Sequence, residues 1–264
     1  MKGRVLVVAG SDSGGGAGVQ ADIKTITALN GFAMTAVTAL TAQNSVTVSG
    51  IHKAPPEFVA EQIRVTLEDL GADAAKTGMM ADGSIIEAAA DVLDEMAANV
   101  PWVIDPVMVS TSRDPLLDDA AILSLTTRLI SKAAIVTPNM TEAAMLTGLD
   151  VKTVEDMEHA AEALLDMGAG AALVTGGHMQ GDTLIDVLLT PQGKERFETP
   201  RINTPHTHGT GCTLASAIAC GLAQGMLIGD AVVRGREYVI EAIRTAPGFG
   251  SGHGPLNHAH TVKE

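Results

Sequence analysis

The stretch VLVVAGSDSGGGAGVQADIKTITAL, residues 5–29, determines the fold class of this 264-residue chain. Its first five residues form an apolar run of the kind found in strands that are buried on both faces. A glycine-rich loop over residues 10–18 follows, and the next apolar residues, 19, 23, 26 and 29, repeat at helical spacing. A strand, a glycine loop and a helix in this order predict an α/β sheet.

The rest of the chain continues this alternation. Residues 33–49 are predicted to be extended, and residues 74–79 to form a short strand that enters a loop. Short buried strands are expected at 100–104, 134–136 and 171–174, with antiparallel edge strands at 184–189 and 196–199. Helices are predicted over 59–70, closed by Gly71; over 85–96; over 117–130; from Thr153, with Asp156 able to complete its cap; over 213–226; and over 232–243. No repeat or linker divides the chain, so we expect one domain over residues 1–264.

The composition limits the classes of protein to which this chain could belong. Hydrophobic residues make up 46% of the chain and charged residues 18%, which is typical of a globular protein. The formal net charge of -14 disfavours binding to nucleic acid or to an anionic membrane. The two cysteines, Cys212 and Cys220, fall on one predicted helix, roughly 12 Å apart along its axis. They are too far apart for a disulfide, and this pattern favours a reducing cytoplasm.

A second glycine-rich turn, His208-Gly209-Thr210-Gly211-Cys212, precedes an uncharged helical run. The first N–H groups of a helix have no partner inside the helix, and the helix dipole adds partial positive charge there. This turn therefore suits an anion such as phosphate. Cys212 lies at the helix start, where we expect its thiol to ionise more easily than usual. An ordinary turn before a core helix is the alternative.

Three further polar residues are candidates for a site. Asp105 follows a predicted buried strand, and open α/β sheets place their sites at the carboxyl ends of strands. Glu142 falls in the first turn of a helix, where it could also simply complement the helix dipole. Gln43 carries an amide that can donate and accept, which suits the edge of a heteroaromatic ring, although the surrounding sequence is also turn-like.

Three other patterns are weaker. Residues 16–21 fit the dinucleotide fingerprint, but no Asp or Glu occurs from Ile23 to Pro56 to hold a ribose, and the loop lacks a Walker ending. The uncharged run before Asp230 contains GxxxGxxxG, but its polar residues favour a buried helix over a membrane span. His258 and His260 could ligate a metal, but no acid or cysteine lies beside them.

A set of motifs occurs in a definite order along nearly the whole chain. The set consists of Gly10 with residues 14–18, Ala42-Gln43-Asn44, Lys76-Thr77-Gly78-Met79, Asp105-Pro106-Val107-Met108, Thr137-Pro138-Asn139 with Glu142, Gly176-Gly177-His178 and residues 208–212. Together the motifs closely resemble the hydroxymethylpyrimidine/phosphomethylpyrimidine kinases of thiamine biosynthesis, which are ribokinase-like enzymes. The resemblance implies a three-layer α/β/α fold with a mainly parallel central sheet, usually in a homodimer. It also implies that ATP and Mg²⁺ are used to phosphorylate 4-amino-5-hydroxymethyl-2-methylpyrimidine and then its monophosphate.

The resemblance also implies roles for residues. Gln43 would read the pyrimidine edge, with Gly10, Ala17 and Met79 beside it. Asp105 and Glu142 would lie in the metal and phosphate region. Gly209, Thr210 and Gly211 would form an anion hole, with Cys212 where most ribokinase-like sugar kinases carry an Asp base. Phosphoryl transfer depends mainly on positioning and charge stabilisation, which such a set supplies.

The chain departs from this pattern near the expected ATP phosphates. Many relatives carry a Lys before Gly-Gly-His, whereas this chain has Thr175 before Gly176 and Gly177, and Thr111 likewise replaces a common Lys. A less positive phosphate site would weaken ATP binding unless another cation, such as Lys76 or Arg113, serves it. Pyridoxal kinase is the nearest alternative activity, and a pyrimidine-binding protein without transfer activity is a more distant one.

Overall fold

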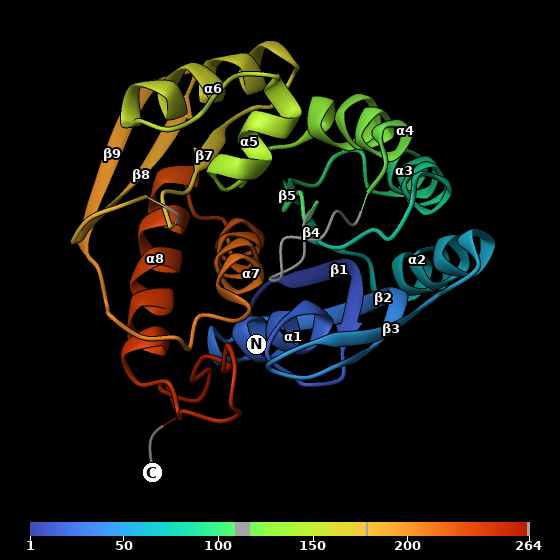
Figure 1. Cartoon of the computed structure of the whole chain (residues 1–264). Coiled ribbons are helices and arrows are strands. Elements are labelled where there is room, and N and C mark those ends of the chain that lie inside the picture. The colour runs from blue at the N-terminus through green and yellow to red at the C-terminus, as the bar shows by residue number, and fades with distance from the viewer. Residues whose placement is uncertain (109–116, 178, 263–264) are drawn as a thin grey trace.

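The structure is a computed structural model and describes residues 1–108, 117–177 and 179–262 (Figure 1). Within these ranges, nine strands form one sheet in the order β3-β2-β1-β4-β5-β6-β7-β8-β9. Their bounds are β1 Arg4–Asp12, β2 Phe32–Gln43, β3 Val48–Lys53, β4 Ala74–Thr77, β5 Trp102–Ile104, β6 Ile135–Val136, β7 Ala172–Val174, β8 Thr183–Thr190 and β9 Gly193–Pro200.

The central six strands, from β2 to β7, are all parallel to one another. The strands at the two ends of the sheet, β3 on one side and β8 and β9 on the other, pair antiparallel. This confirms the mainly parallel sheet. The expectation of two edge strands was wrong for β8, because it pairs with β7 as well as β9 and only β9 forms the edge.

Helices cover both faces of the sheet, which gives the expected three layers (Figure 1). Successive residues of a strand point to opposite faces, so Leu6 and Val8 of β1 join one core while Val5 and Val7 join the other. The first core is closed by α2 Pro56–Leu70, α3 Gly83–Met96, α4 Asp119–Ser124, α5 Met140–Thr147 and α6 Val154–Asp166. The second is closed by α1 Gly18–Ala28, α7 Thr210–Ala223 and α8 Ile228–Arg244.

The local end signals of two helices are confirmed. The chain leaves α2 at Gly71, whose φ of 63° is one that glycine adopts without strain. At the start of α6, the Thr153 hydroxyl accepts the N–H of Asp156, whose carboxylate accepts the N–H of Thr153 in return. This reciprocal capping satisfies N–H groups that the helix itself cannot.

Two predicted helices differ in the structure. The segment expected as one helix over 117–130 begins at Asp119, because the Asp118 carboxylate caps it, and passes into a π-helix at Leu125–Leu129 and a 3₁₀ turn at Ile130–Lys132. The wider winding brings Ile130, five residues after Leu125, onto the same buried face. The helix expected to run to Met226 ends at Ala223, because Gly225 adopts a φ of 83°.

That break splits the GxxxGxxxG pattern between two helices. Gly221 lies in α7 and packs so closely on Ala231 of α8 that an added Cβ would lie 2.7 Å from the Ala231 Cβ. Of the three glycines, Gly221 therefore serves the contact between α7 and α8, whereas a Cβ on Gly225 or Gly229 would meet nothing within 4 Å. In the described part of the chain, no helix has the length and apolar character needed to cross a lipid bilayer.

Candidate active site

The predicted site residues gather at the carboxyl ends of the parallel strands, around the start of α7. Close glycine contacts join the loop after β1 to the turn before α7. A Cβ on Gly209 would lie 1.9 Å from the Gly16 carbonyl oxygen and 3.2 Å from the Ala17 Cα. Gly209 also has a φ of 85°, which other residues rarely adopt. Ala17 and Gly209, far apart in sequence, are thereby held in contact.

Asp12 is the polar centre of this junction. Its carboxylate accepts the N–H groups of Gly14, Gly16 and Ala17 at 2.7, 3.0 and 2.9 Å. It also lies 2.8 Å from His208 Nε2. Burial raises the pKa of Asp12, but the hydrogen bonds from His208 and the backbone outweigh burial and hold this pKa below its ordinary value. Asp12 therefore stays ionised and fixes both segments.

Gln43 faces the same junction from the end of β2. Its Nε2 lies 3.4 Å from His208 Nε2, and its Oε1 accepts a hydrogen bond from the Thr41 hydroxyl at 3.1 Å. Its main chain is tied to the glycine loop, because the Ser13 hydroxyl bonds both its N–H and its carbonyl. The side-chain amide is thus held beside His208.

Gly10 and Met79 also come together. A Cβ on Gly10 would lie 2.3 Å from the Met79 methyl carbon, so the Met79 side chain packs against the Gly10 backbone and would have to shift for a larger residue. The Met79 carbonyl accepts the Thr38 hydroxyl at 2.7 Å, which fixes the loop after β4 against β2. The four residues expected at the substrate thus lie on neighbouring segments: β1, the start of α1, β2 and the loop after β4.

A buried ion pair lies beneath the start of α7. Lys76 is 0% exposed, and its Nζ bonds the two Asp22 carboxylate oxygens at 3.0 and 3.2 Å and lies 3.9 Å from Asp105 Oδ2. Burial lowers the pKa of Lys76, but Asp22, with Cys212 and Asp105, outweighs burial and raises this pKa above its ordinary value. Ser216 of α7 donates to Asp22 at 2.6 Å and ties the pair to that helix. Lys76 is therefore a fixed positive charge.

Cys212 lies against this cluster. We expected the Cys212 thiol to ionise easily, and for the chain by itself this expectation is wrong. Burial raises the pKa of the thiol to about 12. The charge of Lys76 lowers this pKa, whereas the charges of Asp22 and Asp105 raise it further. The helix start supplies less stabilisation than the thiolate loses by leaving water near two carboxylates. Cys212 is therefore a thiol at neutral pH.

Asp105 and Glu142 lie close enough to affect each other. Burial raises the pKa of Asp105 to about 6, and burial together with the charge of Asp105 raises the pKa of Glu142 to about 8. Glu142 does more than complement a dipole, because it accepts the N–H of Asn139 at 3.0 Å and that of Met108 at 3.5 Å.

The donors at this pair suit a hard cation. Asp105 Oδ2 is buried and receives no hydrogen bond from any described residue. Across residues 1–108, 117–177 and 179–262, no three His, Cys, Asp or Glu side chains gather as metal ligands. Two carboxylates without a closed protein cage fit Mg²⁺, which retains waters and takes further ligands from phosphates.

One of the three residues expected to form an anion hole, Thr210, has its donors occupied. The N–H and hydroxyl of Thr210 are both directed to the Thr207 carbonyl, at 3.3 and 2.7 Å. No described residue outside the helix accepts the N–H of Gly211 or Cys212. A Cβ on Gly211 would lie 3.8 Å from the Asp105 carboxylate oxygens, so Gly211 lies beside this carboxylate. Gly211 and Cys212, with Gly209 shaping the turn, are the better donors for an anion.

Thr175 and Gly177 lie at the end of β7. The Thr175 N–H donates to the Pro138 carbonyl at 2.9 Å, beside the turn that leads to Glu142. Gly177 is exposed, with nothing within 4 Å of where a Cβ would be. Arg201 donates to the carbonyls of Gly177 and Gly181, at 3.4 and 2.7 Å, and brings a positive charge to this loop. Thr111 and Arg113 lie outside the described residues.

Sequence reasoning missed the roles of Asp12, Asp22 and Ser216. A signal existed for Asp22, which lies three residues after Val19 and four before Ile26 and thus on the buried face of its helix. A charged residue on such a face needs a buried partner. His258, considered above as a metal ligand, instead lies 3.1 Å from the Thr213 hydroxyl in α7.

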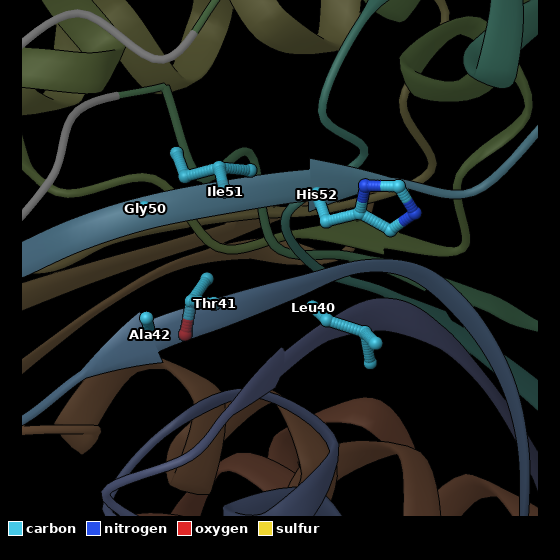
Figure 2. A pocket seen from close by; sticks show the side chains of 6 residues that line it. All are labelled: Leu40, Thr41, Ala42, Gly50, Ile51 and His52. Carbon is cyan, nitrogen blue, oxygen red and sulfur yellow. The ribbon is translucent and has the colours of Figure 1, made fainter.

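A separate hollow of about 380 Å³ lies on β2 and β3. Figure 2 shows the six residues that line it: Leu40, Thr41, Ala42, Gly50, Ile51 and His52. Leu40 and Ile51 are large apolar side chains that are about half exposed, 55% and 47%. Of the site residues described above, only Thr41 lines the hollow, and no acid does, so we do not place the active site there.

Comparisons with known proteins agree with this geometry. Residues 12–257 match the family described as phosphomethylpyrimidine kinase. The chain is 45% identical to the hydroxymethylpyrimidine/phosphomethylpyrimidine kinase of Streptomyces coelicolor, covering 98% of this chain and 96% of that one. It is 47% identical to the thiamine biosynthesis bifunctional protein ThiED of Geobacter sulfurreducens, covering 97% of this chain but only 52% of that protein. A solved ADP complex of Bacillus subtilis pyridoxal kinase superposes with a TM-score of 0.90 at 34% identity, covering 98% of both chains.

Proposed function

The chain belongs to the phosphomethylpyrimidine kinase family and has its ribokinase-like fold, and from that premise we propose its substrates. It is a phosphotransferase that takes the γ-phosphoryl group of ATP. The acceptors are 4-amino-5-hydroxymethyl-2-methylpyrimidine and then its monophosphate, which becomes the diphosphate used for thiamine.

The contact between Gly16 and Gly209 carries this proposal. It places the Gln43 amide, with Gly10, Ala17 and Met79, on one side of a junction whose other side is the start of α7 with Cys212. A pyrimidine held at Gln43 through its ring edge would present its hydroxymethyl group to Cys212 and to the N–H groups of Gly211 and Cys212. Holding reactants in this way is the largest part of what a kinase must do.

In the first transfer, the substrate hydroxyl oxygen bonds to the γ-phosphorus while the bond from that phosphorus to the bridging oxygen breaks and ADP leaves. In the second transfer, a phosphate oxygen of the monophosphate is the attacking atom. Cys212 Sγ takes the hydroxyl proton of the first transfer as a thiolate, after its own proton has passed to solvent, which requires a lower thiol pKa than in the chain by itself. The Lys76 ammonium already acts in that direction, whereas Asp105 and Asp22 oppose it. Neutralising the charge of Asp105 would therefore favour the thiolate.

Asp105 and Glu142 are the residues that would hold Mg²⁺, since both have raised pKa values and Asp105 Oδ2 lacks a hydrogen bond from the described residues. The ion would supply charge neutralisation for the phosphates when bound. Gly177 and Thr175, at the end of β7, border the region for the ATP phosphates. Arg201, which donates to the Gly177 and Gly181 carbonyls, would supply the positive charge that many relatives obtain from a Lys.

Three further properties belong to the proposal. Residues 1–264 act as one kinase domain, which agrees with the single sheet shared by strands from residue 4 to residue 200. The enzyme works as a homodimer in the cytoplasm. The two free cysteines in the described structure suit a reducing compartment, and the exposed apolar residues of β2 and β3 offer a surface for a second copy.

Parallel substrate assays test the function. ADP release is measured with the hydroxymethylpyrimidine, with its monophosphate and with pyridoxal, at saturating ATP and Mg²⁺. We expect turnover with both pyrimidines and a kcat/KM for pyridoxal at least ~10-fold lower, a discrimination that ring hydrogen bonds can supply. Turnover of pyridoxal in preference to both pyrimidines would replace the proposed activity with that of the structural neighbour.

A further inference from the structure

The segment after α8 returns to the junction described above. Beyond Arg244 the chain runs past α1, where the Thr261 hydroxyl donates to the Ala28 carbonyl at 3.5 Å (Figure 1). We call residues 252–258, Gly-His-Gly-Pro-Leu-Asn-His, the C-terminal strap. The strap contacts two segments that the proposed function uses. These are the turn after Gln43 and the start of α7.

The first half of the strap holds the turn after Gln43. The His253 N–H donates to the Ser45 carbonyl at 2.8 Å, and the Gly252 N–H donates to the Ser45 hydroxyl at 3.3 Å. The fit is close, because a Cβ on Gly252 would lie 2.2 Å from the Ser45 carbonyl oxygen. Ser45 is two residues from Gln43, so the position of the strap determines that of the Gln43 amide.

The middle of the strap holds His208. The His208 N–H donates to the Gly254 carbonyl at 3.2 Å, and His208 pairs with Pro255 as in a short parallel bridge. A Cβ on Gly16 would lie 2.5 Å from the His208 ring and 3.2 Å from the Pro255 Cβ. The strap thus lies behind the same ring that contacts Asp12 and Gln43.

The end of the strap holds the start of α7. The Thr213 hydroxyl donates to the Gly209 carbonyl at 2.8 Å and also shares a hydrogen bond with His258 Nε2 at 3.1 Å. Thr213 is 0% exposed and His258 is 7% exposed. The His258 carbonyl in turn accepts the Tyr238 hydroxyl at 3.0 Å, which anchors the strap to α8.

We propose that the C-terminal strap is a positioning element with two separable effects. Its Gly252 end sets the pyrimidine-reading Gln43, and its His258 end sets the Gly209 turn and thereby the N–H groups that face the transferred phosphoryl group. None of its residues touches a reacting atom. This inference takes the roles of Gln43 and Gly211 from the proposed function. The contacts of the strap are independent of that function.

The two ends predict opposite kinetic effects. Gly252→Ala drives a methyl group into the Ser45 carbonyl and displaces the turn, so the pyrimidine KM should rise ~10-fold while kcat stays within about twofold, because a misplaced amide leaves ring groups unpaired. His258→Leu removes the partner of Thr213, so kcat should fall ~10-fold to 100-fold with little change in pyrimidine KM. His258→Gln, which can still bond the hydroxyl, should restore most of kcat.

The matched control is Gly229→Ala, the same chemical change where a Cβ would meet nothing within 4 Å. All variants are assayed as full chains, and the melting temperature of each variant is measured as well. Amide hydrogen exchange over residues 43–47 and 208–213 gives a second readout that needs no substrate. We expect faster exchange over 43–47 in Gly252→Ala and over 208–213 in His258→Leu, and neither change in the control.

The outcomes are distinguishable. If both strap variants match Gly229→Ala in kinetics and exchange, or if each variant raises KM and lowers kcat equally, the two-ended positioning role is overturned. If the wild-type chain phosphorylates no pyrimidine, the proposed function fails, and the exchange comparison alone decides whether the strap holds the two segments. If either the proposed function or the positioning role of the strap fails, the other can still be tested.

Discussion

His208 Nε2 lies 2.8 Å from Asp12 Oδ2, across 196 residues of sequence. The same Asp12 carboxylate accepts three N–H groups of the glycine loop, so one buried charge joins that loop to the turn before α7. This contact explains why the loop does not offer a dinucleotide site, although its sequence fits the dinucleotide fingerprint. Its N–H groups at Gly14, Gly16 and Ala17 already bind the carboxylate of Asp12 and are not open to a pyrophosphate.

Cys212→Ala should lower kcat by roughly 10²-fold or more, because the proton acceptor for the substrate hydroxyl is removed. ATP affinity, measured by calorimetry, should stay near that of the wild type. Cys220→Ala is the control, since it removes the other thiol of α7, which lies buried eight residues further along the helix and hydrogen-bonds the carbonyls of Ile26 and Leu29. Near-normal turnover by Cys212→Ala would mean that the thiol is not the base.

Gln43→Leu should weaken pyrimidine binding by about 1–3 kcal/mol, since the polar edge of the ring would be buried without a partner. ATP affinity should change little. Gln192→Leu makes the same substitution in the exposed turn between β8 and β9 and should alter neither affinity. Equal losses of both affinities in Gln43→Leu would show damage to the fold instead of a specific contact.

Asp105→Asn combined with Glu142→Gln should raise the Mg²⁺ concentration needed for half-maximal activity, because both proposed anionic ligands are lost. The rise in melting temperature on adding Mg²⁺ with ADP should shrink as well, which provides a readout apart from turnover. Asp150→Asn combined with Glu155→Gln changes two exposed acids of the same types and serves as the control. An unchanged Mg²⁺ titration would rule the pair out.

Thr175→Lys should tighten ATP binding by between a few-fold and ~30-fold, since a charged contact is worth roughly 1.5–3 kcal/mol and a neutral one about 1 kcal/mol. Pyrimidine affinity should stay nearly constant. Gln192→Lys adds the same charge in an exposed turn and controls for the change in net charge. Unchanged ATP binding would mean that residue 175 does not face the phosphates, and weaker binding would mean that Arg201 or Lys76 already fills that place.

His258 should make the protein sensitive to acid. Burial lowers the pKa of His258 from 6.5 to about 4, so between these values the unfolded chain binds a proton that the folded chain excludes. Its contribution to stability is therefore present above pH 6.5 and is lost as the pH falls to 4. The free energy of unfolding falls by about 3 kcal/mol over this range, since one pKa unit corresponds to about 1.4 kcal/mol.

Urea unfolding of the wild type and His258→Gln between pH 7 and pH 4 measures this contribution. The wild type should lose more stability than the variant over that range, because glutamine does not titrate. Parallel curves for the two proteins would mean that His258 has nearly its ordinary pKa in the folded state.

Periodicity and end signals predicted the architecture well because they are local. The apolar run at residues 5–9, the glycine at position 71 and the cap at Thr153 each act within a few residues of themselves, and each appears in the structure where it was expected. The π-helical winding after Ser124 was not predictable in this way, because it depends on which side of the segment the rest of the chain buries.

The site was predicted less completely, because its electrostatics depend on contacts distant in sequence. The order of motifs indicated Gln43, Asp105, Glu142 and Cys212, and the structure brings the last three together. The start of a helix suggested an easily ionised Cys212. Only the fold shows that the thiol is buried beside two carboxylates, and that burial, together with their charges, raises its pKa instead.

The strap also determines when a newly made chain can first become active. Asp12 emerges from the ribosome early, but its partner His208 follows 196 residues later, and His258 follows that by a further 50. A nascent chain can form β1 and its glycine loop, whose N–H groups bind Asp12, but it cannot complete the junction until the strap has been synthesised. Pairings this distant in sequence also form slowly during folding. A chain that lacks residue 258 therefore cannot hold the junction in the arrangement seen here.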